Sequence, residues 1–238
     1  MSDTIDKSSD RVRRMFGSIA GRYDLLNHLL SMGIDLYWRR RTVRLVPPPD
    51  DGPILDVCTG TGDLALAYWK ASGRSARIVA TDFCHPMLVL ANSKGRRAGA
   101  EQHISWLEAD TQQLPFAADT FQIVCVAFGL RNVSDTDRGL AEMTRVCRPG
   151  GSVAVLEFSM PTIWPLSALY RFYFRRVLPR VGQALAKNEE SAYNYLPASV
   201  SQFPQGAELC ARMQAAGLSN TEFHPFTLGI ATLYVGRK

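Results

Sequence analysis

Short apolar runs alternate with longer amphipathic segments through the middle of the chain. Each run is bounded by turn residues, which is the pattern of strands buried on both faces of a sheet. The predicted strands are 54–58, 77–82, 104–110, 121–128 and 152–158. The helices predicted between them are 63–71, about 86–98 and about 135–147. Strands and helices that alternate at this spacing favour a parallel sheet with right-handed crossovers.

The N-terminal part of the chain has a different pattern. Residues 11–46 carry apolar residues at helical spacing, with a break at 31–33. The sequence PPPDDG at 47–52 ends the helical pattern, because proline and glycine cannot continue it. We therefore predict two helices before the first strand.

The C-terminal part departs from the alternation as well. After residue 158 about 45 residues pass before a helix is predicted near 206–216. Two closing strands, at about 219–227 and 230–237, are separated by a tight reversal at Leu228-Gly229. The complete pattern predicts an α/β fold: a mostly parallel seven-stranded sheet with a C-terminal antiparallel hairpin and helices on both faces.

The excess of bases over acids in the chain comes from one stretch. The formal net charge is +5, from 27 Lys and Arg against 22 Asp and Glu. Residues 158–188 contain five bases and no acid, so the rest of the chain is balanced at 22 bases and 22 acids. A local basic and aromatic stretch argues against a general nucleic-acid coat, and we predict no nucleic-acid partner.

Composition excludes several other classes of protein. No apolar run reaches the roughly 18 residues of a membrane-spanning helix, and from the polar, acidic start MSDTIDKSSD we expect no secretory signal. Five cysteines without a CxxC pair indicate reduced thiols, and four scattered histidines give no metal-ligand pattern. We expect a cytoplasmic protein without a metal site.

A glycine-rich turn follows the first predicted strand. The segment ILDVCTGTGDLALA places Gly60 and Gly62 between the strand and the next helix. Glycine suits this turn because the backbone must bend tightly and approach a ligand without a Cβ atom in the way. Open parallel sheets bind ligands at the carboxyl ends of their strands, so we predict the site there.

Two ligand classes fit this turn. Residues 60–65 match the pattern GxGxxA, and Asp82 lies 20 residues beyond Gly62, as in dinucleotide-binding proteins. However, Asp63 at the helix start would repel a pyrophosphate. S-adenosylmethionine has no phosphate and carries a cationic sulfonium, which suits the acids near the strand ends. These acids are Asp56, Asp63, Asp82 and Asp110, although some of them could only cap helices.

The order of motifs resembles that of class I S-adenosylmethionine-dependent methyltransferases. The motifs are DVCTGTGD, TD at 81–82, EADTQQLPF at 108–116 and RPGG at 148–151. One departure is Cys58, which stands where the family pattern has its first glycine. The resemblance implies that Asp82 holds the ribose hydroxyls and that Asp110 and Thr111 meet the adenine. It also implies that the methionine end is surrounded by Asp56, Gly60, Thr61 and Gly62.

Flanking motifs narrow the resemblance to the ubiquinone/menaquinone biosynthesis C-methyltransferase family. They are MFGSIAGRYDLLNHLLSMGIDLYWRR, FGLRNVSD, LEFSMP and YNYLPASVSQFP, in this order over about residues 11–238. The resemblance implies methyl transfer to a ring carbon of a prenylated quinol. The alternatives are a methyltransferase with another small aromatic or lipid acceptor and a non-catalytic cofactor-binding or dehydrogenase protein. The sequence leaves open whether the acceptor ring is a naphthoquinol or a benzoquinol.

Three residues are candidates for catalysis. A quinol carbon becomes nucleophilic when a neighbouring phenol loses its proton, so the site must accept the proton and stabilise the oxyanion. Arg131 could stabilise the phenolate or orient a water, and Asn132 could fix a ring oxygen; alternatively, Arg131 pairs with a carboxylate at the strand end. Tyr23, with Asp24 beside it, could close over the acceptor, or its helix could simply pack on the sheet.

The acid-free stretch suits a lipid-tailed acceptor. A prenylated substrate resides in the bilayer, and interleaved aromatic, apolar and Arg side chains suit contact with a membrane surface. We predict peripheral contact with the inner face of the membrane; the alternative is a covering helix or a homodimer contact. The expected organisation is one structural domain in four parts. These are an N-terminal helical cover (1–52), the S-adenosylmethionine-binding core (53–158), a substrate- and membrane-facing insertion (159–205) and a closing helix with its hairpin (206–238).

Overall fold

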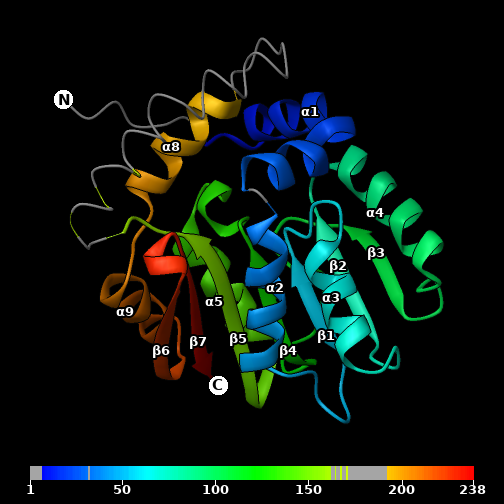
Figure 1. Cartoon of the computed structure of the whole chain (residues 1–238). Helices are drawn as coiled ribbons and strands as arrows, with labels where there is room; N and C mark the ends of the chain where they lie inside the picture. The colour runs from blue at the N-terminus through cyan, green and yellow to red at the C-terminus, as the bar shows by residue number, and fades with distance from the viewer. Residues whose placement is uncertain (1–6, 32, 162–163, 165–166, 168–169, 171–191) are drawn as a thin grey trace.

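A seven-stranded sheet with helices on both faces forms the body of the molecule (Figure 1). The computed structural model describes residues 7–31, 33–161, 164, 167, 170 and 192–238. The strands are β1 (Ile54–Val57), β2 (Ile78–Asp82), β3 (Ile104–Glu108), β4 (Phe121–Ala127), β5 (Cys147–Phe158), β6 (Ser219–Phe226) and β7 (Ala231–Arg237). Their order is β3-β2-β1-β4-β5-β7-β6. Only β7 runs antiparallel to its neighbours, so the predicted sheet and its closing hairpin are confirmed.

The order in which successive strands join the sheet reverses between β1 and β4, although these two strands are parallel. From β1 the strands proceed to β2 and β3 on one side, whereas β4 and β5 lie on the other. All four residues of β1 are buried, because the strand is central and covered on both faces. The loops that leave the carboxyl ends of β1 and β4 diverge at this point, which opens a crevice suited to a ligand.

Helices cover the two faces in separate groups (Figure 1). They are α1 (Ser9–Leu30), α2 (Ile34–Leu45), α3 (Asp63–Ala71), α4 (His85–Ala98), α5 (Thr136–Val146), α8 (Ala192–Gln202) and α9 (Ala207–Ala215), with short 3₁₀ turns η1 (Leu130–Asn132) and η3 (Thr227–Gly229). Helices α2 and α3 pack on one face of the sheet, with Trp38 and Trp69 in the same apolar cluster. Helices α5 and α9 cover the other face through Met143 and Met213.

Helices α1 and α8 lie across the end of the sheet where the parallel strands finish (Figure 1). Met15 and Ile19 of α1 pack against Tyr195 of α8, which joins the two helices. The break predicted at 31–33 is confirmed: α1 ends at Leu30 and α2 starts after Gly33, whose φ of 75° favours glycine. Helix α8 was not predicted, since Pro197 lies inside it and proline usually breaks a helix.

Most of the predicted insertion, including its basic aromatic stretch, lies outside the described residues. The division of the chain into four parts stays a prediction. Among the described residues no helix combines the length and the apolar character that crossing a bilayer requires, and they contain no group of metal-ligating side chains.

Candidate cofactor and acceptor site

The turn after β1 is held in left-handed backbone conformations. Cys58, Gly60 and Gly62 have φ values of 49°, 57° and 84°. A Cβ atom on Gly62 would lie 2.5 Å from the ring of Trp106, so glycine is required there by packing as well as by backbone angle. The turn is formed although Cys58 stands where the family pattern has its first glycine, and a non-glycine residue in this conformation is strained by about 1–2 kcal/mol.

Asp56 lies behind the turn and holds it in shape. Its Oδ2 atom accepts hydrogen bonds from Thr59 Oγ1 at 2.5 Å and from the backbone amide of Ala65 at 3.1 Å. Complete burial raises the pKa of Asp56 to about 7. Asp56 does not line the neighbouring cavity, so the structure places this predicted cofactor residue as a support of the turn.

Asp82 connects the end of β2 to the same turn. Its Oδ2 accepts a hydrogen bond from the amide of Gly60 at 2.8 Å, and its Oδ1 accepts one from the amide of Cys84 at 2.9 Å. Burial raises the pKa of Asp82 to about 6, against the opposing effect of these amides. The carboxylate has further lone pairs and lines the cavity, so it can accept hydrogen bonds from a ligand.

A cavity opens between this turn, the carboxyl ends of β2 and β4, and the two N-terminal helices. Its walls are Phe16, Arg39, Cys58, Thr59, Gly60, Thr61, Asp63, Asp82, Phe83, Met87, Ala127, Phe128, Gly129, Asn132 and Val133. Of the predicted cofactor residues, Gly60, Thr61 and Asp82 lie in these walls. Asp110 is exposed, and its Oδ1 accepts from the amide of Gln112. Thr111 is buried, with its hydroxyl 3.2 Å from the Cys58 sulfur.

The side chains of the cavity fit S-adenosylmethionine. Asn132 lines the cavity, and its Oδ1 atom is buried without a hydrogen-bond partner among the described residues, which is unusual for a buried polar atom. Asp82 offers a carboxylate, and Phe83 beside it offers an apolar face. Burial raises the pKa of the Cys58 thiol, so this sulfur is neutral and weakly nucleophilic where a methyl donor would bind.

Three charged residues connect helix α1 to the turn. Lys94 Nζ lies 2.6 Å from Asp24 Oδ2 and 2.7 Å from Asp63 Oδ1, and Asp24 Oδ1 accepts from the Thr61 hydroxyl at 2.5 Å. We call Asp24, Lys94 and Asp63 the α1 clasp. Because Asp63 is ion-paired, its repulsion of a pyrophosphate is weaker than the sequence argument assumed.

Arg131 follows β4 and is held in a buried ion pair. Its Nη1 lies 2.9 Å from Glu157 Oε2 and also donates to the carbonyl of Phe128. Its backbone amide donates to Glu157 Oε1 at 3.1 Å. Arg131 therefore does pair with a carboxylate at a strand end, which was one of its two predicted roles. Arg131 is not among the lining residues of the cavity, whereas Asn132 is.

An aromatic cluster that the sequence analysis missed borders the cavity. The ring centroid of Phe128 lies 5.9 Å from that of Trp38 and 4.5 Å from that of Phe158. Arg39 lies over Phe128 and Arg131 over Phe158, each with its guanidinium carbon 5.3 Å from the ring centroid. These rings come from α2, β5 and the end of β4, so only the fold brings them together.

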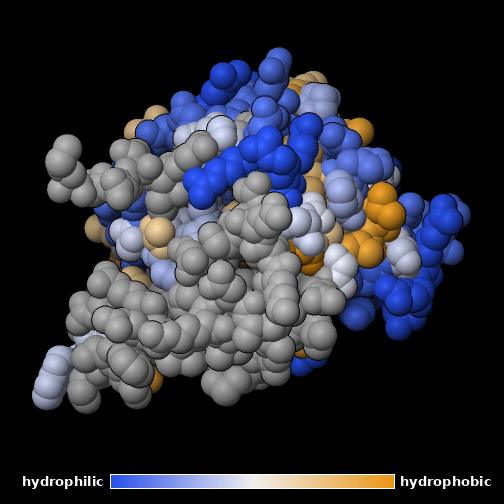
Figure 2. Space-filling model, turned by 90° about the horizontal axis from the view of Figure 1, so that it is seen from above, coloured by the Kyte–Doolittle hydropathy of each residue, from blue (hydrophilic) through white to orange (hydrophobic). Residues whose placement is uncertain are grey.

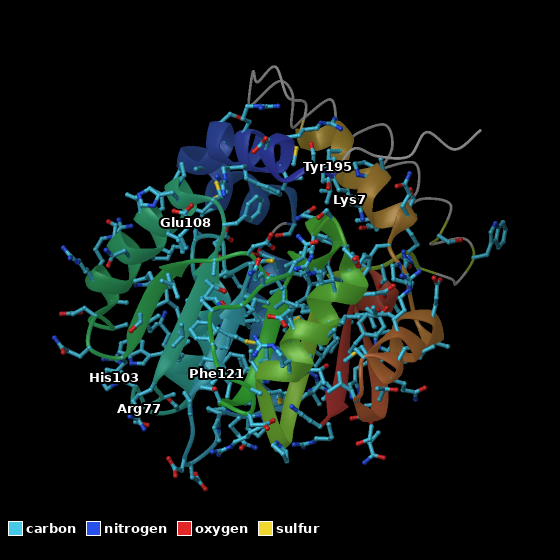
Figure 3. All side chains as sticks on the ribbon, turned by 180° about the vertical axis from the view of Figure 1, so that it is seen from behind. Lys7, Arg77, His103, Glu108, Phe121 and Tyr195 are labelled. Carbon is cyan, nitrogen blue, oxygen red and sulfur yellow. The ribbon has the colours of Figure 1, made fainter. Side chains whose placement is uncertain are left out.

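The third catalytic candidate, Tyr23, lies on α1, but its side chain is outside what the structure describes. Lys7 lies at the same end of the molecule as Tyr195, by α1 and α8 (Figure 3). Burial lowers the pKa of Lys7, an effect that Glu157 opposes and Arg131 reinforces. No motif or pattern in the sequence pointed to this lysine. Seen from above, the described surface at this end is mostly hydrophilic, with a hydrophobic patch at one side (Figure 2).

Residues 4–238 match the model of the ubiE/COQ5 methyltransferase family. The chain belongs to this family. The ubiE/COQ5 fold places the glycine turn, Asp82 and Asn132 around one cavity, and membership makes the protein an S-adenosylmethionine-dependent C-methyltransferase, as the sequence predicted. The dehydrogenase alternative is thereby excluded.

Individual relatives are similar in sequence to this chain over nearly their whole length. The "Ubiquinone/menaquinone biosynthesis C-methyltransferase UbiE" of Geotalea daltonii is 43% identical over 98% of this chain and 99% of its own. The "Demethylmenaquinone methyltransferase" of Thermus thermophilus is 46% identical over 93% of this chain and 99% of its own. Among solved structures, an S-adenosylmethionine-dependent methyltransferase from Thermotoga maritima superposes with a TM-score of 0.66 at 17% identity, covering 94% of this chain and 99% of that one. That likeness shows the fold alone.

Proposed function

We propose that this enzyme transfers a methyl group from S-adenosylmethionine to a ring carbon of a prenylated quinol, converting a demethylmenaquinol to a menaquinol, the equivalent ubiquinol precursor to its methylated product, or both. The observation that carries the proposal is the position of Asn132. This residue lines the cofactor cavity, has a buried acceptor atom without a partner among the described residues, and directly follows Arg131. The names of the curated relatives support the same acceptor class.

The cofactor contacts follow from the walls of the cavity. Asp82 would accept hydrogen bonds from the ribose hydroxyls, and Gly60 and Thr61 would lie at the methionine end. Asp110 and Thr111 are not among the lining residues of the cavity, and their place on the adenine side rests on the family resemblance alone. Asp56 and Gly62 would not contact the cofactor themselves but would hold the turn in the shape that binds it. When bound, S-adenosylmethionine supplies a methyl group on a cationic sulfur, and the chain has to present an electron-rich carbon in line with it.

The acceptor side is built around Arg131 and Asn132. The amide of Asn132 would fix a hydroxyl of the quinol ring next to the cavity. Arg131 stays protonated, so it would favour the phenolate form of the ring without itself taking the proton, although the paired Glu157 offsets part of its charge. Because Glu157 and Phe158 fix the guanidinium, we assign Arg131 as a positioning and electrostatic residue. The aromatic cluster of Trp38, Phe128 and Phe158 provides an apolar border suited to an aromatic acceptor.

Helix α1 would cover the bound molecules. The α1 clasp holds this helix against the glycine turn, and Tyr23 precedes Asp24 on it. We assign Tyr23 to the cover of the acceptor. We also propose that the basic aromatic stretch at 158–188 makes the peripheral membrane contact that a prenyl tail requires, or the contact of a homodimer; its composition is the support for this.

The decisive experiment is product analysis with labelled S-adenosylmethionine. The purified enzyme is incubated with reduced demethylmenaquinone or with the reduced demethoxy ubiquinol precursor, and the extracted lipid is analysed for label on ring carbon. Label in either quinol supports the proposal and identifies the ring that the enzyme accepts. Binding of S-adenosylhomocysteine without label in either product would mean that the acceptor belongs to another class.

A further inference from the structure

A second hollow lies next to the cofactor cavity, over the outer surface of α3 and between α2 and α4. These three helices lie on the same side of the sheet (Figure 1), and the hollow has a volume of about 640 Å³, which is typical of small-molecule sites. We call it the α3 groove. Its lining residues recur at helical spacing, as in Asp63, Leu66, Ala67 and Lys70 of α3, so one face of each helix is turned toward it.

The charge of the α3 groove is strongly one-sided. Five of its lining side chains are bases and one, Asp63, is an acid. Two of the bases are paired: Arg39 with Asp35 at 2.6 Å and Lys94 with Asp63 at 2.7 Å. The other three are exposed and form no ion pair with any described residue. They are Arg40, Arg44 and Lys70. A concave surface with several unpaired bases attracts and concentrates anions.

The floor of the groove is apolar. Leu36 of α2 is 38% exposed, and Leu66 and Ala67 of α3 line the same groove. Val43 lies deeper, with 4% of its surface exposed. None of the lining residues is aromatic, so the groove lacks the stacking surface that single-stranded nucleic acids use. The combination favours an anion that also carries a hydrocarbon part.

We propose that the α3 groove binds a phosphate-bearing amphiphile. Its phosphate contacts Arg40, Arg44 and Lys70, because guanidinium groups match phosphate oxygens in geometry and charge. Its hydrocarbon part lies on Leu36 and the apolar floor between α2 and α3. This chemistry is shared by an anionic phospholipid and by a freely diffusing lipid phosphate, which the experiment below distinguishes.

The occupant of the groove is distinct from the methyl acceptor. The groove and the cofactor cavity share only Arg39 and Asp63 in their walls. The charged groups of these two residues lie 4.0 Å apart, and together with Lys94 they form a polar partition between the two spaces. Asn132, the acceptor-side residue, lines the cavity and not the groove.

The test measures binding of dihexanoyl phosphatidate, below its micelle concentration, by isothermal titration calorimetry. We compare the wild type with the groove variant Arg40→Gln/Arg44→Gln/Lys70→Gln. A matched control, Arg41→Gln/Arg77→Gln/Arg96→Gln, loses the same charge at exposed positions outside the groove. The groove variant should lose affinity by about tenfold or more, and the control should retain it. Leu36→Ser should weaken phosphatidate binding while leaving the weaker binding of inorganic phosphate unchanged.

Several results would overturn the proposal. They are no phosphatidate binding by the wild type, an equal loss in both charge variants, or equal affinity for phosphatidate and inorganic phosphate. Thermal unfolding of each variant shows that it is folded. Co-sedimentation with vesicles of phosphatidylcholine and phosphatidate distinguishes an anionic phospholipid of a bilayer from a freely diffusing lipid phosphate. Weaker sedimentation of the groove variant than of the control supports a bilayer lipid, and equal sedimentation with lost binding of the dispersed probe supports a freely diffusing one.

Discussion

Arg131 and Glu157 form an ion pair from which water is excluded. Their side chains are 6% and 0% exposed, and Arg131 Nη1 lies 2.9 Å from Glu157 Oε2. The pair joins the end of β4 to the end of β5 next to the cofactor cavity. Removing one member leaves the other charged and buried, which costs about 3–5 kcal/mol.

We therefore expect Arg131→Ala to lower the free energy of unfolding by about 3–5 kcal/mol, measured by unfolding in urea. The exposed Arg212 pairs with Asp137 and Glu208, so Arg212→Ala should cost less than about 1 kcal/mol.

For catalysis, Arg131→Lys keeps the positive charge but not the planar guanidinium group. Its turnover should fall by about 10²-fold or more, with the affinity for S-adenosylhomocysteine unchanged. Normal turnover of this variant would remove Arg131 from the mechanism.

Cofactor affinity should depend on the ionisation of Asp82. Ribose hydroxyls donate to the carboxylate, so binding favours the ionised form, and burial gives this group a pKa of about 6. As the pH falls from 7.5 to 5, the dissociation constant of S-adenosylhomocysteine should rise, approaching about tenfold per unit below the pKa. Calorimetry across this range measures the effect.

Asp82→Asn should weaken binding at pH 7.5 and remove most of its pH dependence. The control is Asp56→Asn, because Asp56 is also buried and has a pKa raised to about 7 but does not line the cavity. Its pH dependence should resemble that of the wild type. If Asp56→Asn removed the dependence and Asp82→Asn did not, the assignment would be reversed.

The α1 clasp should contribute to cofactor retention. Lys94→Met breaks the contacts to Asp24 and Asp63, which are partly exposed, so the loss should be about 1 kcal/mol. This corresponds to a rise of about fivefold in the dissociation constant of S-adenosylhomocysteine, seen mainly as faster dissociation in stopped-flow measurements. Lys238→Met breaks the comparable pair with Asp119, which does not involve the site, and should leave the constant unchanged. Equal constants in both variants would mean that α1 stays closed without the clasp.

Cys58→Gly should stabilise the protein. Cys58 has a φ of 49°, and relief of about 1–2 kcal/mol of strain exceeds the added chain entropy of about 0.5–1 kcal/mol. The loss of the contact with Thr111 reduces this gain, so we expect up to about 1 kcal/mol. Cys147, which is buried, has a φ of −71°, and Cys147→Gly should be destabilising. Unfolding in urea with unchanged slope compares the two; a less stable Cys58→Gly variant would show that the Thr111 contact matters more than the strain.

The basic stretch should carry membrane binding. Replacing Arg171, Arg175, Arg176 and Arg180 by Gln should weaken co-sedimentation with anionic liposomes by at least about tenfold, since each base near an anionic surface contributes about 1 kcal/mol. Affinity for S-adenosylhomocysteine should not change. A matched variant at Arg41, Arg77, Arg96 and Arg97 removes four exposed bases elsewhere. Unchanged liposome binding by the first variant would reject the membrane role of this stretch.

The sequence predicted local elements well and their spatial partners less well. The strand at 54–58, the turn at Gly60 and Gly62 and the helix at 63–71 were all predicted, because apolar runs and glycines mark them directly. Helix α8 was missed, since Pro197 within it reads as a break. The partners of Asp63 were missed because Arg39 and Lys94 lie 24 and 31 residues away from it in the chain.

By itself, the sequence determined the α/β alternation, the closing hairpin and the motifs that mark the family, because each depends on residues that are neighbours in the chain. Only the tertiary structure decided that Asp56 supports the turn while Asp82 faces the cavity, although both acids lie at strand ends. It also decided that Arg131 pairs with Glu157 while Asn132 keeps an unpaired acceptor. These outcomes depend on burial and on contacts between distant segments, which arise only when the helices pack on the sheet and exclude water.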